Sequence, residues 1–341
     1  MSAADASASR PDRFNRGETY AALDLGTNNC RLLVARSNGR QAEVSFRVID
    51  AFSRIVRLGE GLAASGRLAE PAMARTVEAL KICAAKVALH RVAGARYIAT
   101  EACRRAANCA DFMGRVARET GIALEIISAE EEARLVVAGC APLLERAQPY
   151  AIVFDIGGGS TELVWLRLEG ESGEPQILDS ISLPHGVVTL CDRYGGREVS
   201  AATYAAMVAE IGAALVAVEA RHAIARRVAE GAVQMLGSSG TVTTLAAVHL
   251  GLSRYSRSRV DGVRVSFDDL RRATQLLQSR THDQRVRHPC IGAERADLVL
   301  GGCAILEAIC RLWPVSSLRV ADRGIREGIL SGLVRRCAEA P

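Results

Sequence analysis

Hydrophobic and polar positions along the chain predict two successive series of strands and helices. In the first series, short apolar runs predict strands, and longer mixed runs predict helices: strands at 19–24, 30–36, around 43–49, 97–100 and 123–127, with helices at 71–92 and 109–120. The second series contains these elements: strands at 150–155, 161–168, 176–183 and 318–322, a strand-to-helix junction at 235–241, and helices at 200–220, 267–279 and 325–335. The mixture predicts an α/β protein.

Each series opens on the same short unit, in which an apolar strand ends in aspartate and a turn of small residues follows. The two copies read ALDLGT at 22–27 and VFDIGG at 153–158, and the second continues into a third glycine, Gly159. Such a turn presents a carboxylate and backbone N–H groups to one cleft, which suits phosphates and a divalent cation. Two copies, each opening one half of the chain, predict two such turns that face each other.

Length and patterning predict two domains and no membrane span. The chain has 341 residues, and domains usually hold roughly 100–200 residues. No apolar run reaches the ~18 residues that a membrane helix needs. Residues 1–16 are small and polar and lack the apolar segment of a secretory signal. We therefore expect a disordered tail at 1–16 on a cytoplasmic protein.

Charge and cysteine usage exclude several classes of function. The formal net charge is +5, and no basic block with interleaved aromatic residues is present, so nucleic-acid binding is not expected. The ten cysteines are scattered without a CxxC pair, and the six histidines show no ligand spacing. Free thiols are expected, and a metal site built from cysteine or histidine is not.

An ordered set of motifs resembles a known family. The segments are DLGTNNCRLLVA, VRLGEGL, ATEACRRAAN, EIISAEEEARL, FDIGGGSTELV, SLPHGVVTL, GSSGTVTTLA, RADLVLGG and VADRGIREGIL. Together, over about residues 20–335, they resemble the exopolyphosphatase and guanosine pentaphosphate phosphohydrolase (Ppx/GppA) family in its short two-domain form. Two positions depart from the usual pattern: the first turn reads Thr-Asn-Asn rather than Ser-Asn-Ser, and His185 stands where a small apolar residue is commoner.

The resemblance implies a two-lobed, duplicated ribonuclease H-like fold of the actin, Hsp70 and sugar-kinase superfamily, with an interdomain cleft. We expect residues 17–128 plus 317–341 to form the first lobe and residues 129–316 to form the second. The superfamily also implies that the cleft closes over substrate, and the family is compatible with a homodimer.

The resemblance further implies the chemistry of the cleft. Glu132 matches the general base, whereas from the residues alone Glu130, Glu131 and Glu132 could simply favour the positive end of a helix. Because neighbours on a helix are ~100° apart, only one of the three is expected to face the cleft. Glu162 and Arg104 are the other expected catalytic residues. Asp24 and Asp155 are expected to hold Mg²⁺ or Mn²⁺.

Two further groups of residues are expected to contact the substrate. The phosphate-binding group is Gly26, Thr27, Asn28, Asn29, Arg31, Arg57, Gly157, Gly158, Gly159 and Ser160. The loop on the nucleoside side contains Gly237, Ser238, Gly240 and Thr241. For this loop, a simple strand-to-helix turn explains the residues equally well.

The resemblance implies an enzyme that releases terminal orthophosphate from inorganic polyphosphate, and pppGpp is a second candidate substrate. One alternative is a small-molecule kinase that uses ATP in the same fold, although such kinases usually employ an aspartate base. Another is a sensor that binds polyphosphate or (p)ppGpp without hydrolysis. The retained acids argue against a sensor, since binding of polyanions alone would favour their loss.

Overall fold

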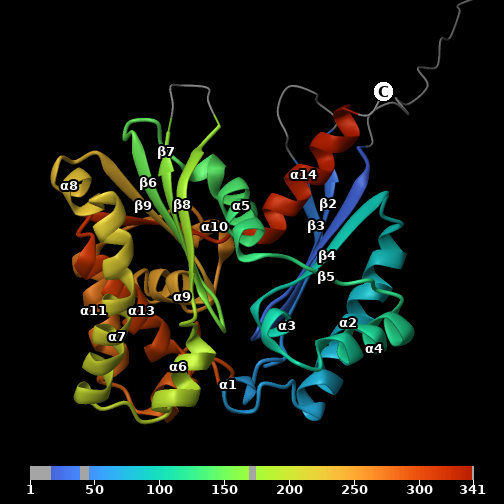
Figure 1. Ribbon diagram of the computed structural model, residues 1–341, viewed down its shortest axis with the longest axis horizontal. Helices are drawn as coiled ribbons and strands as arrows, with labels where there is room; N and C mark the ends of the chain where they lie inside the picture. The colour runs from blue at the N-terminus through green and yellow to red at the C-terminus, as the bar shows by residue number, and fades with distance from the viewer. Residues whose placement is uncertain (1–16, 39–45, 169–173, 340–341) are drawn as a thin grey trace, which may run out of the picture.

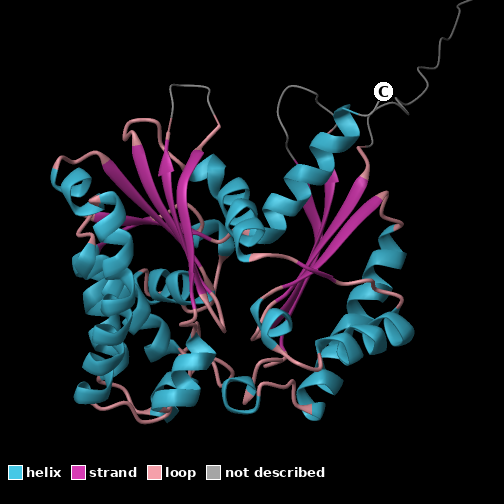
Figure 2. Cartoon of the chain, in the orientation of Figure 1, coloured by secondary structure: helices cyan, strands magenta, loops and turns pink. Residues whose placement is uncertain are grey.

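The computed structural model describes residues 17–38, 46–168 and 174–339 and consists of two α/β lobes (Figure 1). The predicted tail at 1–16, and the first three residues of the strand expected around 43–49, lie outside the described residues. Each lobe is a mixed sheet with helices packed on it (Figure 2).

The first lobe holds a five-stranded sheet in the order β3-β2-β1-β4-β5. Its strands are β1 (Thr19–Leu25), β2 (Asn29–Ser37), β3 (Phe46–Ile55), β4 (Gly94–Ala99) and β5 (Glu125–Ile126). Its helices are α1 (Leu62–Ser65), α2 (Glu70–His90), α3 (Glu101–Arg105) and α4 (Cys109–Thr120). Strands β1 to β3 pair antiparallel, whereas β4 and β5 run parallel to β1.

The second lobe holds a six-stranded sheet in the order β10-β11-β9-β6-β7-β8. Its strands are β6 (Tyr150–Ile156), β7 (Thr161–Arg167), β8 (Gln176–Leu183), β9 (Val233–Ser238), β10 (Arg264–Ser266) and β11 (Ser317–Ala321). The helices from α5 onward are α5 (Ala129–Cys140), the 3-10 turn η1 (Ala141–Leu143), α6 (Val187–Tyr194), α7 (Ala201–His222), α8 (Ile224–Ala229), α9 (Gly240–His249), α10 (Arg257–Val260), α11 (Phe267–Gln278), α12 (His282–Val286), α13 (Val299–Leu312) and α14 (Ile325–Glu339).

The two sheets repeat one topology, which confirms the predicted duplicated fold. The order β8-β7-β6-β9-β11 reproduces β3-β2-β1-β4-β5, with three antiparallel strands followed by two parallel ones. Strand β10 is an addition at the free edge of β11. The repeat also aligns the two aspartates: Asp24 pairs with Arg31 on β2, and Asp155 pairs with Glu162 on β7.

Helices α5 and α14 cross between the two sheets (Figure 1). Their backbones meet so closely that a Cβ atom on Gly139 would lie 1.9 Å from the carbonyl oxygen of Gly324, and one on Gly328 would lie 2.1 Å from that of Leu135. The buried side chains around them come from both sheets and form one shared core. Two further cores lie on the outer faces, one in each lobe.

The C-terminal segment divides between the lobes, which corrects the predicted boundary at residue 317. Strand β11 pairs with β9 and therefore belongs to the second sheet, whereas the expectation placed it in the first lobe. Helix α14 alone crosses over and packs on β1, β2 and β4 of the first sheet. A strand next to an interdomain crossing carries no local signal for the sheet that it joins, because pairing is set by non-local contacts.

Helix α7 is the single helix of the described chain that is long and apolar enough, by composition, to cross a membrane. Its apolar side packs against α13 in the core of the second lobe, where Met207, Ile211 and Leu215 are buried. This packing accounts for its hydrophobicity.

Candidate active site

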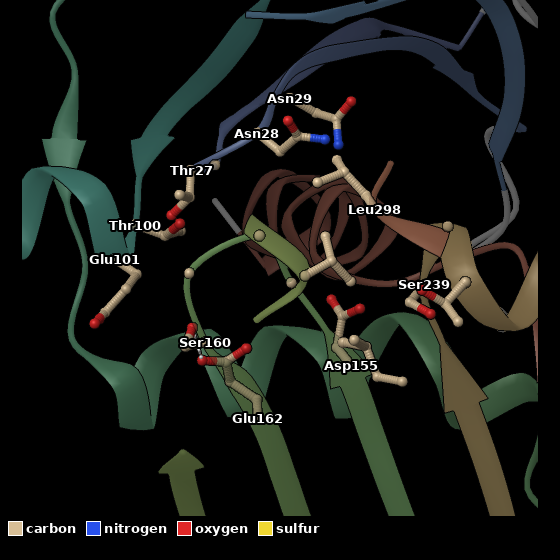
Figure 3. Close-up of a pocket in the computed structure, with 18 of the residues that line it drawn as sticks. Thr27, Asn28, Asn29, Thr100, Glu101, Asp155, Ser160, Glu162, Ser239 and Leu298 are labelled. Carbon is tan, nitrogen blue, oxygen red and sulfur yellow. Dashed lines mark hydrogen bonds between the residues drawn. The ribbon is translucent and has the colours of Figure 1, made fainter. Parts of the chain in front are cut away.

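Strands β1 and β6, in which Asp24 and Asp155 are the next-to-last residues, lead into tight turns that touch each other across the interlobe cleft. One hydrogen bond closes each turn: Gly26 N–H donates to the carbonyl of Asn29, and Gly157 N–H donates to that of Ser160, both at 2.9 Å. A Cβ atom on Gly158 would lie 3.0 Å from both the N and the Cβ of Asn28. Only glycine leaves this space, so the triple glycine allows close approach of the opposite turn. Figure 3 shows the two turns together with the side chains around them.

The N-terminus of α6 binds the carbonyl groups of the turn at residues 157–160, which we call the glycine turn. Val187 N–H donates to the carbonyl of Gly157 at 3.0 Å, and Val188 N–H donates to that of Gly158 at 2.8 Å. In a planar trans peptide the C=O and the N–H point in opposite directions. The N–H groups of Gly158 and Gly159 are therefore directed away from α6 and toward the cleft. Neither has a hydrogen-bond acceptor within the described residues, so both can bind an anion.

One pocket between the lobes is lined by most of the predicted site residues. They are Asp24, Gly26, Thr27, Asn28, Asn29, Arg31, Glu132, Asp155, Gly157, Gly158, Gly159, Ser160, Glu162, Gly240 and Thr241. They come from both lobes, from the ends of the paired strands and from the starts of α5 and α9. The fold therefore gathers in one place residues that are far apart in the sequence.

Glu132 is the single buried acid in the run of three glutamates. Ser128 caps α5 by accepting the N–H of Glu131 at 3.2 Å, and this fixes the direction of the first helical turn. Glu132 is 5% exposed and lines the pocket, whereas Glu131 pairs with Arg96 at 2.9 Å outside it. Burial raises the pKa of Glu132 well above its ordinary value, and the nearby charge of Glu162 raises it further.

Arg104 holds Glu132 in place from the first lobe. Its Nη1 donates to Oε2 of Glu132 at 2.7 Å and to the carbonyl of Ile127 at 3.1 Å. Its Nε and Nη2 donate to Glu101 at 3.2 and 3.0 Å. Arg104 itself does not line the pocket, whereas both of its carboxylate partners, Glu101 and Glu132, do. Its charge opposes the rise in the pKa of Glu132.

Glu162 faces the same pocket from the strand that leaves the glycine turn. Its Oε1 accepts hydrogen bonds from the hydroxyls of Ser160 at 2.6 Å and Ser182 at 2.9 Å. Burial raises the pKa of Glu162, while the two serine hydroxyls oppose that rise. Glu162 is 2% exposed, so its side chain does not face solvent.

A model of the Ppx/GppA phosphatase family matches residues 34–337 of the chain. The chain belongs to the Ppx/GppA phosphatase family. It is 32% identical over 324 residues to exopolyphosphatase 2 of Mycobacterium tuberculosis. The aligned region covers 92% of this chain and 98% of that protein. It is 30% identical over 321 residues to guanosine-5′-triphosphate,3′-diphosphate pyrophosphatase of Aeromonas salmonicida, of which it covers 59%.

Solved structures of Ppx/GppA proteins share the fold. The crystal structure of the Aquifex aeolicus family member is 26% identical and superposes with a TM-score of 0.74, covering 95% of this chain and 99% of that one. An exopolyphosphatase from Cytophaga hutchinsonii superposes with a TM-score of 0.82 at 24% identity, covering 93% and 98% of the two chains. The predicted actin-like, two-lobed architecture is confirmed.

Some residues predicted for the Ppx/GppA site do not line this pocket. Arg57, expected to bind phosphate, instead pairs with Asp297 of the second lobe at 3.0 Å and so bridges the lobes. Gly237 lies inside β9, where a Cβ atom would overlap the ring of Phe154 at 2.6 Å, so packing explains this glycine. Ser238 donates to the carbonyl of Arg323 at 2.9 Å and lines an adjoining chamber.

The structure adds pocket residues that sequence reasoning did not single out. Glu101 and Thr100 belong to the motif from which Arg104 was chosen, and the i, i+3 spacing of Glu101 and Arg104 was the available signal. Arg295 belongs to the matched RADLVLGG segment and lines both the pocket and the adjoining chamber. No hydrogen bond or ion pair occupies its guanidinium within the described residues.

Proposed function

We propose that this protein is a metal-dependent phosphohydrolase that releases terminal orthophosphate from inorganic polyphosphate, and that it also accepts the 5′-phosphate of pppGpp. The environment of Glu132 is the main support for this proposal. Glu132 is a buried carboxylate with a raised pKa at the pocket where two anion-binding turns meet. Burial and a neighbouring acid bring a glutamate toward the pKa that a general base needs near neutral pH.

Two groups of residues divide the reaction between them. The free N–H groups of Gly158 and Gly159, with the hydroxyl of Thr27, bind the oxygens of the terminal phosphoryl group. Glu132, oriented by Arg104, accepts a proton from the attacking water. The water oxygen forms a new bond to the terminal phosphorus as the P–O bond to the rest of the chain breaks. The terminal group becomes orthophosphate, and the shortened polyphosphate keeps the bridging oxygen and leaves along the cleft. Catalysis of this kind depends on positioning and on charge stabilisation rather than on a covalent intermediate.

Asp24 and Asp155 form a donor set that fits Mg²⁺ or Mn²⁺. Both carboxylates line the pocket, and they occupy equivalent positions in the two halves of the fold. No group of three or more acidic, histidine or cysteine ligands exists within the described residues. Mg²⁺ does not require one, because it commonly binds one or two carboxylates with waters and substrate phosphates. When bound, the ion would neutralise phosphate charge.

Removal of divalent cations tests this assignment. We expect a chelator to abolish orthophosphate release and added Mg²⁺ to restore it. Asp155→Asn should raise the Mg²⁺ concentration needed for half-maximal rate about tenfold or more, since a hard cation loses a charged ligand. Titration of rate against Mg²⁺ measures this shift. An unchanged half-maximal Mg²⁺ concentration in a folded Asp155→Asn protein would exclude the residue as a ligand.

The adjoining chamber provides room for the rest of a polyanionic substrate. It shares Asp24, Arg31, Asp155 and Arg295 with the first pocket, and it continues to Arg257, Arg323 and Arg326. Within the described residues, no hydrogen bond or ion pair occupies the guanidinium groups of Arg31, Arg295 and Arg326. Arg31 and Arg326 lie close enough to Asp24 to lower its pKa, and all three guanidinium groups can still donate to phosphate oxygens. The near-complete coverage of exopolyphosphatase 2 supports polyphosphate as the leading substrate, whereas the chain spans 59% of the Aeromonas enzyme.

Orthophosphate release from separate samples of long-chain polyphosphate and pppGpp tests the proposal. With Mg²⁺ and no acceptor molecule, we expect release from polyphosphate and conversion of pppGpp to ppGpp. The ratio of kcat/KM for the two substrates then ranks them. Release that requires an added acceptor would favour a kinase, and tight binding of both polyanions without release would favour a sensor.

A further inference from the structure

His185, which departs from the family pattern, lies between β8 and α6 and is fixed at both its ring and its backbone. Its side chain is 12% exposed, and Nε2 lies 2.8 Å from Oε1 of Glu210 on α7. Its carbonyl accepts the hydroxyl of Thr161, the first residue of β7, at 2.6 Å. The next residue, Gly186, precedes the first turn of α6. His185 thus connects α7, β7 and the start of α6.

Glu210 is held as an anion that can accept from the histidine. Burial would raise the pKa of Glu210, but hydrogen bonds from Tyr194 and Arg193 outweigh burial and lower it. Nδ1 of His185 is buried without a hydrogen-bond partner. A buried Nδ1–H donor without an acceptor would be costly, so the neutral tautomer with its proton on Nε2 is favoured. Nε2–H then donates to Glu210.

Gly186 connects His185 to the glycine turn, because its backbone packs directly against Gly158 and Gly159. A Cβ atom on Gly186 would lie 2.3 Å from the carbonyl oxygen of Gly158 and 2.6 Å from the nitrogen of Gly159. Directly after it, the N–H groups of Val187 and Val188 bind the carbonyls of Gly157 and Gly158. A displacement of residue 186 would therefore tilt the peptides whose N–H groups are directed into the cleft.

We propose that His185 is a positioning residue for phosphoryl transfer, acting through its bond to Glu210 to hold the start of α6 against the glycine turn. The inference rests on the proposed function, because the turn is the site where the transferred phosphoryl group binds. This role requires a hydrogen-bond donor at the position of Nε2, within reach of Glu210. Loss of this donor displaces the turn without removing any group that touches the substrate.

The test compares substitutions at His185 with a matched histidine elsewhere. In His185→Ala, kcat for orthophosphate release from polyphosphate should fall about 10- to 100-fold, with a smaller change in KM, because the misplaced N–H groups matter most in the transition state. His185→Gln keeps an N–H donor near the position of Nε2 and should restore most of the rate. His185→Asn, whose amide reaches only the position of Nδ1, should not.

His222 offers the matched control, since it forms the same kind of pair with Asp179 at 2.7 Å and belongs to the same lobe. His222→Ala should keep the kcat of the unaltered protein. If His185→Ala fails to fold, as judged by circular dichroism and melting temperature, Thr161→Val removes the second anchor with little change of shape. It should lower kcat in the same way.

The outcomes separate this inference from the proposed function. Release by the unaltered protein, with normal kcat in a folded His185→Ala protein, would contradict this inference alone. A His185→Gln protein as slow as His185→Ala would also contradict it. Absence of release by the unaltered protein would contradict the proposed function and this inference with it.

Discussion

Replacement of Glu132 by glutamine is expected to lower kcat for orthophosphate release about 100- to 10 000-fold, the usual range for loss of general base catalysis. The substitution keeps the size of the side chain and an oxygen that can accept from Arg104, but it removes the site that takes the proton. KM should change little, because binding of the polyanion depends on the turns and the arginines. Steady-state kinetics on polyphosphate measures both quantities.

Glu131→Gln is the matched control for this prediction. Glu131 precedes Glu132 on the same helical turn but pairs with Arg96 at 2.9 Å and does not line the pocket. The control variant should release orthophosphate at the rate of the unaltered protein. Equal losses in the two variants would indicate damage to the start of α5 rather than removal of a base.

The raised pKa of Glu132 adds an expected pH dependence. Burial, and then the charge of Glu162, raise this pKa above the ordinary value of 4.5, while Arg104 opposes the rise. A general base works only when deprotonated, so kcat should fall as the pH drops through this raised pKa. The acid limb of the kcat profile should therefore lie at higher pH than free glutamate predicts. A limb at the ordinary pKa of glutamate would contradict the burial seen here.

Gly158→Ala is expected to lower kcat/KM by up to about 100-fold, the loss that a full misplacement of 1 Å at a reacting centre can cause. The added methyl group would lie 3.0 Å from the N and the Cβ of Asn28 and 3.1 Å from the Cβ of Thr27. These contacts are tighter than ordinary van der Waals contact, so the opposite turn must shift by a few tenths of an ångström. The terminal phosphoryl group would then be held less well by the two lobes together.

Gly212→Ala provides the same chemical change without the contact. Gly212 lies in α7, and a Cβ atom there meets nothing within 4 Å. This variant should retain full activity, and its melting temperature should be unchanged or slightly higher because alanine favours helix. Comparison of kcat/KM and melting temperature for the two variants distinguishes damage to the active site from destabilisation of the fold. A fully active Gly158→Ala protein would show that the turns do not need to meet.

Local patterns were enough to predict the parts of the site that depend on short segments. The repeated strand, aspartate and glycine unit predicted both turns. The structure bears this out, since the two turns meet. The resemblance then predicted which glutamate faces the cleft, because three adjacent acids at a helix start carry no local signal that distinguishes them.

Long-range pairing explains what the sequence could not predict. Arg57 was expected to bind phosphate because it follows hairpin and glycine elements along the chain, but its partner, Asp297, lies 240 residues away. Strand β11 was assigned to the wrong lobe because the segment reads the same in either sheet. The support of the glycine turn by α6 was equally hidden, since it depends on backbone hydrogen bonds between segments about 30 residues apart.

We propose that the interlobe pocket hydrolyses a terminal phosphoanhydride with Glu132 as the base. The most direct measurement is the initial rate of orthophosphate release from long-chain polyphosphate with Mg²⁺, in the unaltered protein and in Glu132→Gln, with polyphosphate affinity measured in both. We expect release by the unaltered protein, and at most about a hundredth of that rate in a variant that still binds the substrate. Equal rates in the two proteins, or binding without release by the unaltered protein, would contradict it.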